Sequence, residues 1–450
     1  MQQKTVHAPI VREWGEASDS HPSGAEVNLA PASGESPSST EWLMEAICEP
    51  NNLRVALKRV KANKGAPGTD GMSVNELPEY LKHHWLELKT QLLSGKYCPL
   101  PVRRVFIPKP GGGERLLGIP TVIDRFIQQA VMQVLQRQWD NTFSPYSYGF
   151  RPGRSAHQAV KQAQEYIESG YGWVVDLDLE KFFDKVNHDV LMSRVEKRVQ
   201  DKRVLSLIRR FLNAGVMEAG LVRPVTEGTP QGGPLSPLLS NLLLNDFDQE
   251  LKKRGLKFVR YADDCNIYVK SERAGQRIMA GLTHWLSRKL KLKVNVKKSA
   301  VARPETRKFL GYTFITGRKV WCVISPESLK RLKTRIKELT GRNTGKSLEQ
   351  LLGSLKSYLT GWKSYYRLNQ WPSLLYKVNR WIRRRLRSVL WKQWKTGSRR
   401  YAELRSRGIS KALAAQTVGS CHKQWRISCS PALNMALPNN LFTRLGLPKL

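Results

Sequence analysis

Two adjacent carboxylates stand in a segment whose residue pattern predicts two short strands around a tight turn. The segment runs from Lys257 to Val269 and reads Lys-Phe-Val-Arg-Tyr-Ala-Asp-Asp-Cys-Asn-Ile-Tyr-Val, so that Asp263 and Asp264 fall at the turn. Carboxylate oxygens suit Mg²⁺, and two ions held roughly 3.5–4 Å apart can activate a hydroxyl and stabilise a leaving pyrophosphate. The pattern therefore indicates nucleotidyl transfer. Because Asp-Asp in a hairpin is also an ordinary turn signal, these residues alone leave a purely structural role open.

An apolar strand upstream supplies a third carboxylate. Asp176 and Asp178 lie in Trp-Val-Val-Asp-Leu-Asp, starting at residue 173, and the period of two places both on one face. Either one could complete a site that the two carboxylates at the turn leave under-ligated, and the pattern does not choose between them. Phe183, five residues past Asp178, is expected to pack beneath an incoming sugar and to exclude a 2′-hydroxyl, which would select deoxynucleotides. Alternatively, the two aspartates simply mark the end of a strand that is exposed to solvent.

Two glycine-rich segments have a physical interpretation of their own. Lys109 and Arg115 flank three glycines, so the backbone can approach a triphosphate closely while two cations neutralise it. A basic surface hairpin has the same composition and remains an alternative. Gln231 lies in Gly-Thr-Pro-Gln-Gly-Gly-Pro, starting at residue 228, and an apolar run over 235–244 behind it predicts a buried helix.

Several motifs, taken in order, resemble those of group II intron reverse transcriptases. The palm motifs are Asp-Leu-Glu-Lys-Phe-Phe-Asp from residue 178 and Tyr-Ala-Asp-Asp from residue 261. The other blocks are Ile-Pro-Lys-Pro-Gly-Gly-Gly-Glu-Arg from residue 107, Tyr-Ser-Tyr-Gly-Phe-Arg-Pro-Gly-Arg from 146, Gly-Thr-Pro-Gln-Gly-Gly-Pro-Leu-Ser-Pro from 228, Asn-Val-Lys-Lys-Ser from 295 and Phe-Leu-Gly-Tyr from 309. Each block is a weak signal alone, but the ordered set is strong. The resemblance runs from about residue 51 to near the C-terminus.

The resemblance implies an α+β right-hand polymerase, in which fingers and a palm with a small antiparallel sheet precede an all-helical thumb and maturase domain. It favours Asp178 over Asp176 and implies that two Mg²⁺ ions are bound by Asp178, Asp263, Asp264 and the backbone carbonyl of Leu179. The residues implied to contact the dNTP are Lys109, Arg115, Phe183 and Gln231. Lys298 falls where the family carries a lysine near the leaving pyrophosphate, which makes it either a general acid or an ordinary exposed lysine.

From residue 328 onward, long helical patterns replace strands and the charge becomes almost entirely positive. Between Lys330 and Arg400 there are twenty Lys and Arg and two Glu, a net charge of +18. Surfaces meant only for solubility mix both signs, so nucleic acid is the expected partner. The stretches 359–367 and 390–395 resemble the maturase-specific segment of the family. The residues predicted to contact phosphates are Arg383, Arg384, Arg385 and Arg387.

Composition agrees with a nucleic-acid enzyme. The chain has 75 Lys and Arg against 37 Asp and Glu, a net charge of +38 in 450 residues, which would steer any polyanion. No apolar stretch of ~18 residues and no signal core occur, so no membrane partner is expected and a cytoplasmic location, in a bacterial cytoplasm or nucleoid, is predicted. The six cysteines form no Cys-x-x-Cys pair, which argues against a zinc ribbon or a disulfide framework.

The domain organisation can be predicted from these shifts in pattern. We expect a flexible extension over 1–40, fingers over 41–170, a palm with the catalytic site over 171–318, a helical thumb and maturase domain over 319–396, and a DNA-binding tail over 397–450. No His-Asn-His or Cys-x-x-Cys endonuclease block occurs, so the resemblance is to the form without that domain.

The function implied is that of a group II intron-encoded RNA-directed DNA polymerase, which also promotes splicing of its intron and mobility by target-primed reverse transcription. The implied partners are group II intron RNA, an RNA template with a DNA primer, target DNA and dNTPs. One alternative is a domesticated relative in DNA repair or phage defence, although alanine at position 262 resembles the mobile-intron form. Another is an RNA-binding splicing cofactor without polymerase activity, against which the intact acidic triad argues.

Overall fold

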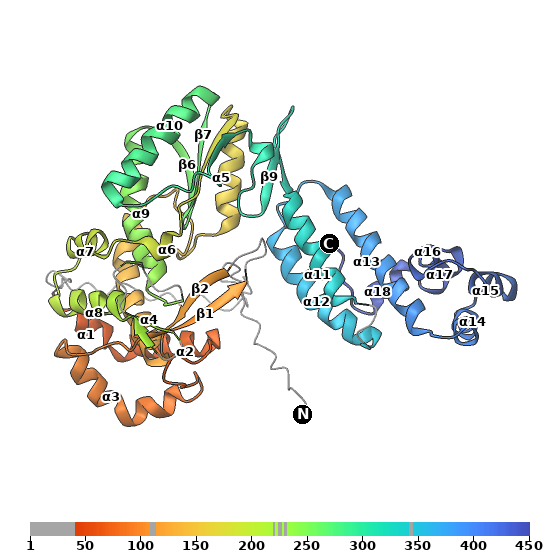
Figure 1. The fold of residues 1–450 in the computed structure, drawn as a ribbon, viewed down its shortest axis with the longest axis horizontal. Coiled ribbons are helices and arrows are strands. Elements are labelled where there is room, and N and C mark those ends of the chain that lie inside the picture. Colours follow the sequence, from red (N-terminus) through yellow and green to blue (C-terminus); the bar gives the residue numbers. More distant parts are fainter. Residues whose placement is uncertain (1–40, 109–113, 219–220, 224–226, 229–231, 342–344) are drawn as a thin grey trace, which may run out of the picture. The chain divides into compact units, whose positions relative to one another are not determined.

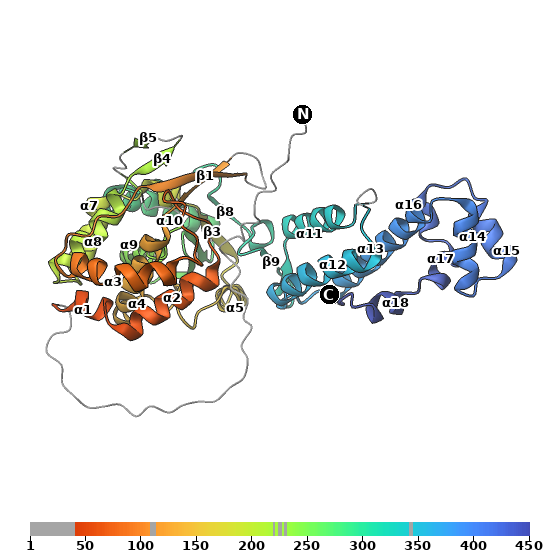
Figure 2. The ribbon, with the colours of Figure 1, turned by 90° about the horizontal axis from the view of Figure 1, so that it is seen from below.

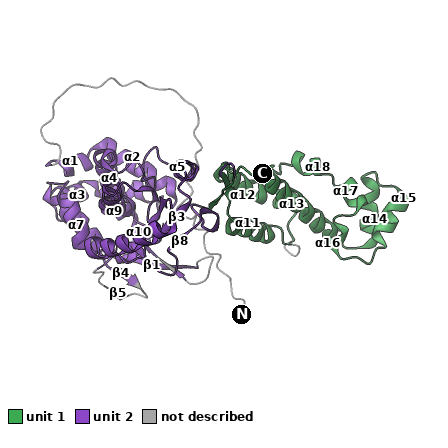
Figure 3. Cartoon of the chain, turned by 90° about the horizontal axis from the view of Figure 1, so that it is seen from above, with its two compact units in different colours: residues 1–31, 311–317, 321–450 green, residues 32–310, 318–320 purple. Residues whose placement is uncertain are grey.

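The computed structural model describes residues 41–450 except 109–113, 219–220, 224–226, 229–231 and 342–344 (Figure 1). The predicted flexible extension over 1–40 lies outside the described residues. The described chain divides into two compact units (Figure 3). The first comprises residues up to 310 together with 318–320, and the second comprises 311–317 and 321–450.

The first unit is mixed helix and strand. Its α-helices are α1 (Leu43–Ile47), α2 (Pro50–Asn63), α3 (Leu77–Leu93), α4 (Val122–Trp139), α5 (Ala156–Glu168), α6 (Phe182–Lys185), α7 (His188–Glu196), α8 (Lys202–Asn213), α9 (Ser236–Lys253) and α10 (Glu272–Trp285). Polar side chains start several of them: Thr121 caps α4, Ser155 forms a capping box with Gln158 on α5, and Asp201 caps α8. The predicted buried helix behind residue 235 is confirmed as α9, whose leucines are buried. Short irregular turns of helix are η1 (Asp140–Thr142), η2 (Leu286–Leu290) and η3 (Pro304–Thr306).

A small antiparallel sheet lies at the centre of this unit, as expected. Its strands are β3 (Trp173–Leu177), β6 (Lys257–Tyr261), β7 (Asp264–Val269) and β8 (Ala300–Ala302), in the order β6-β7-β3-β8. Helix α10 covers one face so closely that a Cβ built on Gly275 would lie 2.5 Å from Val301 Cγ1. Helix α5 packs on the other face, where the rings of Tyr166 and Tyr268 are 5.7 Å apart.

A second four-stranded sheet carries the glycine-rich hairpin. Its strands are β1 (Val102–Pro108), β2 (Glu114–Ile119), β4 (Val216–Glu218) and β5 (Leu221–Arg223), in the order β2-β1-β4-β5. Strands β1 and β2 pair antiparallel, whereas β1 and β4 run parallel. Figure 2 shows β1, β4 and β5 next to one another. The strands on either side of residues 109–113 thus pair with each other, which is compatible with both interpretations of this segment's composition.

The second unit consists of one hairpin and a series of helices. Its elements are β9 (Tyr312–Ile315), β10 (Trp321–Ile324), α11 (Pro326–Leu339), α12 (Leu348–Tyr365), α13 (Pro372–Gln393), α14 (Gly397–Ser406), α15 (Lys411–Val418), α16 (Gln424–Ile427), α17 (Pro431–Ala436) and α18 (Asn439–Arg444). The hairpin belongs with the helices because Tyr312 packs against Tyr366, with ring centroids 5.3 Å apart, and the Gln370 backbone N–H donates to the Cys322 carbonyl. The unit thus begins at residue 311, whereas the sequence pattern placed the end of the palm at 318.

Among the residues that the structure describes, no helix is both long and apolar enough to span a bilayer.

Candidate active site

The turn that carries the acidic pair forms as the sequence predicts. Strand β6 ends at Tyr261, strand β7 begins at Asp264, and these two residues pair across the hairpin. Ala262 adopts a left-handed backbone with φ of 56°, which L-residues other than glycine and asparagine rarely accept. A Cβ built on Gly149 would lie 2.4 Å from the Ala262 backbone nitrogen, so the segment around residue 149 is packed directly on the turn.

The register of β3 against β7 brings the third carboxylate to the same place. Asp176 pairs with Asn266 and Leu177 with Cys265, so Asp178 directly follows the last residue of β3 while Asp264 is the first residue of β7. Because side chains alternate along a strand, Asp176 and Asp264 share one face of the sheet, and Asp178 lies close enough for its negative charge to act on Asp264. Two strands far apart in the sequence therefore converge on one acidic cluster.

This face is buried at one end and open at the other. Tyr268 and Asn266 are each 2% exposed beneath α5, whereas Asp264, Asp263 and Asp178 are partly exposed. Burial raises the pKa of Asp264 well above its ordinary value. Negative charge nearby raises that pKa further, and the contributing carboxylates are Asp176, Asp263 and Asp178. A bound cation would relieve the electrostatic repulsion among these closely spaced carboxylates.

Asp176 and Asp178 differ in their partners. The Arg307 Nε–H donates to Asp176 Oδ2 at 2.8 Å, and the Arg307 Nη2 makes a second contact with the same oxygen. The pair is largely buried, with side-chain exposures of 27% for Arg307 and 13% for Asp176. Burial raises the pKa of Asp176, and Arg307 partly offsets that effect. Asp176 is thus committed to an ion pair within the protein.

Asp178 is bound through its backbone to the turn that carries Lys298. The Asp178 carbonyl accepts from the Asn295 backbone N–H at 2.8 Å, and the Asp178 N–H donates to Ser299 Oγ at 3.0 Å. Lys298 Nζ lies 3.5 Å from Asp178 Oδ2, and both side chains are solvent-accessible. The structure therefore brings the predicted general acid to the predicted metal ligand, although the neighbouring Lys291, Lys293 and Lys297 had made an ordinary surface role an open alternative.

The donor set suits a divalent cation in its chemistry. Carboxylates of Asp178, Asp263 and Asp264 are hard oxygen ligands on one edge of the sheet, and Leu179 directly follows Asp178. Within the described part of the chain, no three His, Cys, Asp or Glu side chains already gather around a common metal position. A bound ion would thus have to draw the flexible ends of these side chains together.

Phe183 and the glycine-rich loop lie beside each other. Phe183 is half-buried on α6, and its ring packs edge-to-face against Phe182 at 5.1 Å. Gly228 has a φ of 94°, and a Cβ at this position would lie 2.9 Å from the carbonyl oxygens of Phe183 and Asp184. His188 Nε2, 2.6 Å from the Gly228 carbonyl oxygen, donates to it, and the Gly228 N–H donates to the Val186 carbonyl. No motif in the sequence pointed to this role of His188.

For three of the residues predicted to contact the nucleotide, the structure does not describe the side chain. Lys109 and Gln231 lie outside the described residues. Arg115 occupies β2, where it pairs with Ile107, and its side chain is not among the described ones. Their roles stay predictions.

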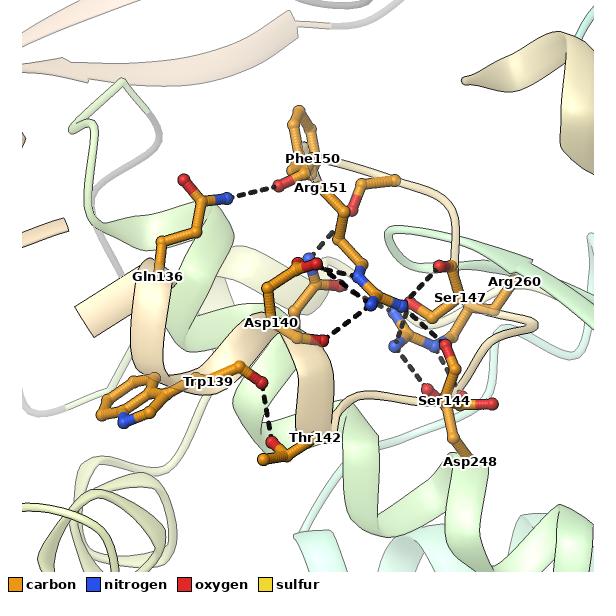
Figure 4. A network of polar contacts seen from close by, with 12 residues as sticks. Gln136, Trp139, Asp140, Thr142, Ser144, Ser147, Phe150, Arg151, Asp248 and Arg260 are labelled. Atoms are coloured by element: carbon orange, nitrogen blue, oxygen red, sulfur yellow. Dashed lines mark hydrogen bonds and ion pairs between the residues drawn. The ribbon is translucent and has the colours of Figure 1, made fainter. Parts of the chain in front are cut away.

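A buried polar network supports the turn from below (Figure 4). The Arg260 guanidinium is 1% exposed, pairs with Asp248 and donates to the carbonyl oxygen of Ala262 at 2.8 Å. Arg151, from the Phe-Arg-Pro-Gly-Arg block, pairs with Asp140 and donates to the Ser147 carbonyl. Arg260 Nη2 also reaches Ser147 Oγ, which links the two halves. The one sequence signal for Arg260 is a charge inside an otherwise apolar strand.

The arginines predicted to contact phosphates occupy α13, and their donors are used within the protein. Arg383 and Arg387 are 4% and 6% exposed, and Arg387 donates to the Leu437 carbonyl and the Asn439 side chain. Arg384 stacks on Trp425 at 4.0 Å, while Arg385 donates to the Thr340 hydroxyl and carbonyl. These contacts tie α13 to the segments around it and give the cluster a structural role. A phosphate contact there stays a prediction.

Two families match the chain. Residues 107–314 match Reverse transcriptase (RNA-dependent DNA polymerase), and residues 329–408 match Group II intron, maturase-specific domain. The first match contains all the candidate carboxylates, and the second covers α11 from residue 329 onward and all of α12, α13 and α14.

Curated relatives agree with these matches. Protein YkfC of Escherichia coli (strain K12) is 34% identical over 355 residues, which cover 70% of this chain and 92% of YkfC. Group II intron-encoded protein LtrA of Lactococcus lactis subsp. cremoris is 35% identical over 219 residues, which cover 48% of this chain and 36% of LtrA. A partial Cas6-RT-Cas1–Cas2 complex aligns over 58% of this chain and 45% of its own, at 25% identity and a TM-score of 0.36. Telomerase from Candida albicans aligns over 68% and 63%, at 16% identity and a TM-score of 0.41. The chain belongs to the reverse transcriptases of the group II intron family and carries that family's maturase-specific domain.

Proposed function

We propose that this protein is an RNA-directed DNA polymerase that extends a DNA primer on an RNA template with dNTPs. The observation that carries the proposal is the antiparallel pairing of β3 with β7, which places Asp178, just after the end of β3, near Asp264, at the start of β7. Family membership supports the same reaction. In this assignment the first unit supplies the fingers and palm, and the second unit begins with the thumb.

The proposed metal ligands are Asp178, Asp263, Asp264 and the backbone carbonyl of Leu179. When bound, two Mg²⁺ ions would lower the pKa of the primer hydroxyl and stabilise charge on the departing pyrophosphate. Asp178 is oriented from behind by Asn295 and Ser299, so its carboxylate stays directed at the open edge. Lys298, which contacts Asp178, would donate a proton or a hydrogen bond to the pyrophosphate oxygen once the nucleotide arrives.

Sugar selection is assigned to Phe183. Its ring is half-buried against Phe182, and its carbonyl oxygen contacts the Gly228 segment, so it has little freedom to move away from a 2′-hydroxyl. Lys109 and Arg115 are proposed to hold the triphosphate, and Gln231 to line the pocket.

We also propose that the second unit binds group II intron RNA and promotes its splicing. On α11, Leu332 and Ile336 are buried while Lys330, Lys333 and Lys337 are exposed, so one surface of the helix is basic. This surface is a better candidate for phosphate contacts than the arginines of α13, whose donors are used internally. The segment after residue 397, which forms α14 to α18, is the proposed contact for target DNA.

Charge reversal can separate RNA binding from polymerisation. We expect Lys330→Glu, Lys333→Glu and Lys337→Glu together to abolish help with splicing of an intron RNA flanking the gene, while primer extension persists. The matched control reverses Lys252, Lys253 and Lys257, which are exposed in the first unit. Unchanged splicing in the α11 variant would refute this surface.

Primer extension by the full chain tests the polymerase itself. With Mg²⁺, dNTPs and an RNA template, extension together with help in splicing would support both activities. Extension without any effect on splicing would favour a domesticated polymerase. Splicing help without extension would leave an RNA-binding cofactor.

A further inference from the structure

Arg307 lies at the meeting point of the acidic face and the Lys298 turn. Its guanidinium contacts Asp176 Oδ2 through both Nε and Nη2, and Nη2 also donates to the Lys298 backbone carbonyl. The two partners are 131 and nine residues away in the sequence. One side chain thus joins β3 to the turn that follows the π-helical segment η2.

Asp176 would be a competing metal ligand without this arginine. It shares a sheet face with Asp264 and lies two residues before Asp178 in the sequence. The two contacts from Arg307 engage Asp176 Oδ2 and balance its charge. Breaking a largely buried ion pair on one side leaves the other charge uncompensated, so removal of Arg307 would return Asp176 to the acidic cluster.

The Lys298 contact has a separate consequence. The Lys298 carbonyl belongs to a turn in which the Lys298 and Ser299 backbone N–H groups both donate to the Asn295 carbonyl. That turn is fastened to Asp178 at one side, by Asn295 and Ser299, and to Arg307 at the other. The long, exposed side chain of Lys298 therefore starts from a fixed backbone position.

We propose that Arg307 is a positioning residue for nucleotidyl transfer, which holds Asp176 away from the metal ligands and fixes the backbone from which Lys298 reaches the pyrophosphate. The proposal rests on the polymerase function proposed above. Arg307 touches neither the substrate nor the ions in this scheme. It determines which of two equally spaced carboxylates is available to bind them.

The test uses the full-length chain and two measurements. Binding of Mn²⁺, as a spectroscopic substitute for Mg²⁺, is followed by electron paramagnetic resonance without nucleotide, and kcat and KM for dNTP are measured by primer extension with Mg²⁺. The variants are Arg307→Ala, Arg307→Lys and the double variant Arg307→Ala with Asp176→Asn. Arg303→Ala is the matched control, because Arg303 stacks on Trp173 and donates to the Gly172 carbonyl at the other end of β3.

We expect Arg307→Ala to bind Mn²⁺ about tenfold more tightly and to lose about tenfold or more in kcat, with a much smaller change in KM. The double variant should return to wild-type Mn²⁺ affinity but keep the low kcat, because it still lacks the hydrogen bond from Arg307 to the Lys298 carbonyl. Arg307→Lys should keep near-normal Mn²⁺ affinity, and Arg303→Ala should match the wild type in both measurements.

Wild-type Mn²⁺ affinity and kcat in folded Arg307→Ala would overturn the proposal, as would equal losses in Arg303→Ala. If Arg307→Ala fails to fold, Arg307→Lys carries the test: it keeps the charge but cannot reach both Asp176 and the Lys298 carbonyl, so an unchanged kcat refutes the positioning role. Failure of the polymerase proposal has a different signature, in which the wild type extends no primer and Asp264→Asn leaves Mn²⁺ binding unchanged.

Discussion

Arg260 donates a hydrogen bond to the carbonyl oxygen of Ala262, two residues along the chain and at the turn that presents the acidic pair. Ala262 has a left-handed backbone, which is unfavourable for alanine by roughly 1–2 kcal/mol, and the buried guanidinium helps to hold it there. Asp248 fixes the guanidinium from α9 through two contacts. The position of the turn that carries the proposed metal ligands Asp263 and Asp264 thus depends on an ion pair that is closed to solvent.

Asp248→Asn is expected to destabilise the first unit strongly, because it leaves the buried Arg260 charge without a counter-ion. Breaking such a pair on one side costs about 3–5 kcal/mol. Urea unfolding followed by tryptophan fluorescence measures this loss. The control is Glu250→Gln, which breaks the Arg254–Glu250 pair on the same helix, where both side chains are partly exposed, and should cost about 0–1 kcal/mol. Equal effects of the two substitutions would contradict the role assigned to Arg260.

Asp264→Asn should stabilise the protein without metal while it abolishes the effect of metal. Burial and neighbouring carboxylates disfavour the Asp264 charge, so removal of that charge relieves repulsion at neutral pH. Thermal unfolding in EDTA should therefore show a higher Tm for the variant than for the wild type. Addition of Mg²⁺ should raise the Tm of the wild type and leave the variant unchanged. A lower Tm for the variant in EDTA would show that repulsion among these carboxylates does not destabilise the metal-free protein.

Gly228→Ala should harm the nucleotide pocket more than an equivalent change elsewhere. Both Gly228 and Gly255 have a positive φ, but a Cβ at Gly228 meets the carbonyl oxygens of Phe183 and Asp184, whereas nothing lies within 4 Å of a Cβ at Gly255. Gly255→Ala therefore costs only the backbone strain, about 1 kcal/mol, while Gly228→Ala must also displace the Phe183 segment. Primer extension should show a raised KM for dNTP and weaker exclusion of ribonucleotides in Gly228→Ala alone. Identical kinetics for both variants would remove the proposed link between this loop and Phe183.

Because the Asp124 carboxyl is buried, we expect the folded protein to lose stability as the pH rises. Burial raises the pKa of this carboxyl from 3.8 to about 6, although the hydrogen bonds that Thr121 and Tyr97 donate to it act in the opposite direction. The folded state holds the proton more tightly than the unfolded state, so this contribution is complete below about pH 4 and is lost as the pH rises through about 6, by about 3 kcal/mol. Urea unfolding at several pH values should show a flatter dependence in this window for Asp124→Asn than for the wild type. The exposed Asp189→Asn should keep the wild-type slope.

The catalytic elements were predictable because they depend on local rules. Alternation of side chains predicted the two strands around the acidic turn, and these are confirmed. It also placed Asp176 and Asp178 on one face, but β3 ends at Leu177, so for Asp178 this stays a prediction. The same rule could not distinguish the two carboxylates, since they are equivalent in spacing. The distinction comes from Arg307, a partner 131 residues away that no period or motif identifies.

The sequence showed where positively charged side chains occur but not which groups they contact. The cluster on α13 was predicted to meet phosphates because its arginines are adjacent and no acidic residue lies nearby. In the structure, Arg383 and Arg387 bind carbonyl and side-chain oxygens of residues after 436, because the C-terminal segments fold back on α13. Solvation of a charge depends on this tertiary packing, so burial could not be inferred from the helix pattern alone.

Primer extension on an RNA template by single variants of the two equivalent aspartates tests the central assignment most directly. With Mg²⁺ and dNTPs, Asp178→Asn should reduce cDNA synthesis to the level without protein, as Asp264→Asn should, because each removes a metal ligand. Asp176→Asn should extend primers at a reduced but measurable rate, because Asp176 acts through Arg307. Near-normal cDNA synthesis by Asp178→Asn, or its loss in Asp176→Asn alone, would contradict this account of the site.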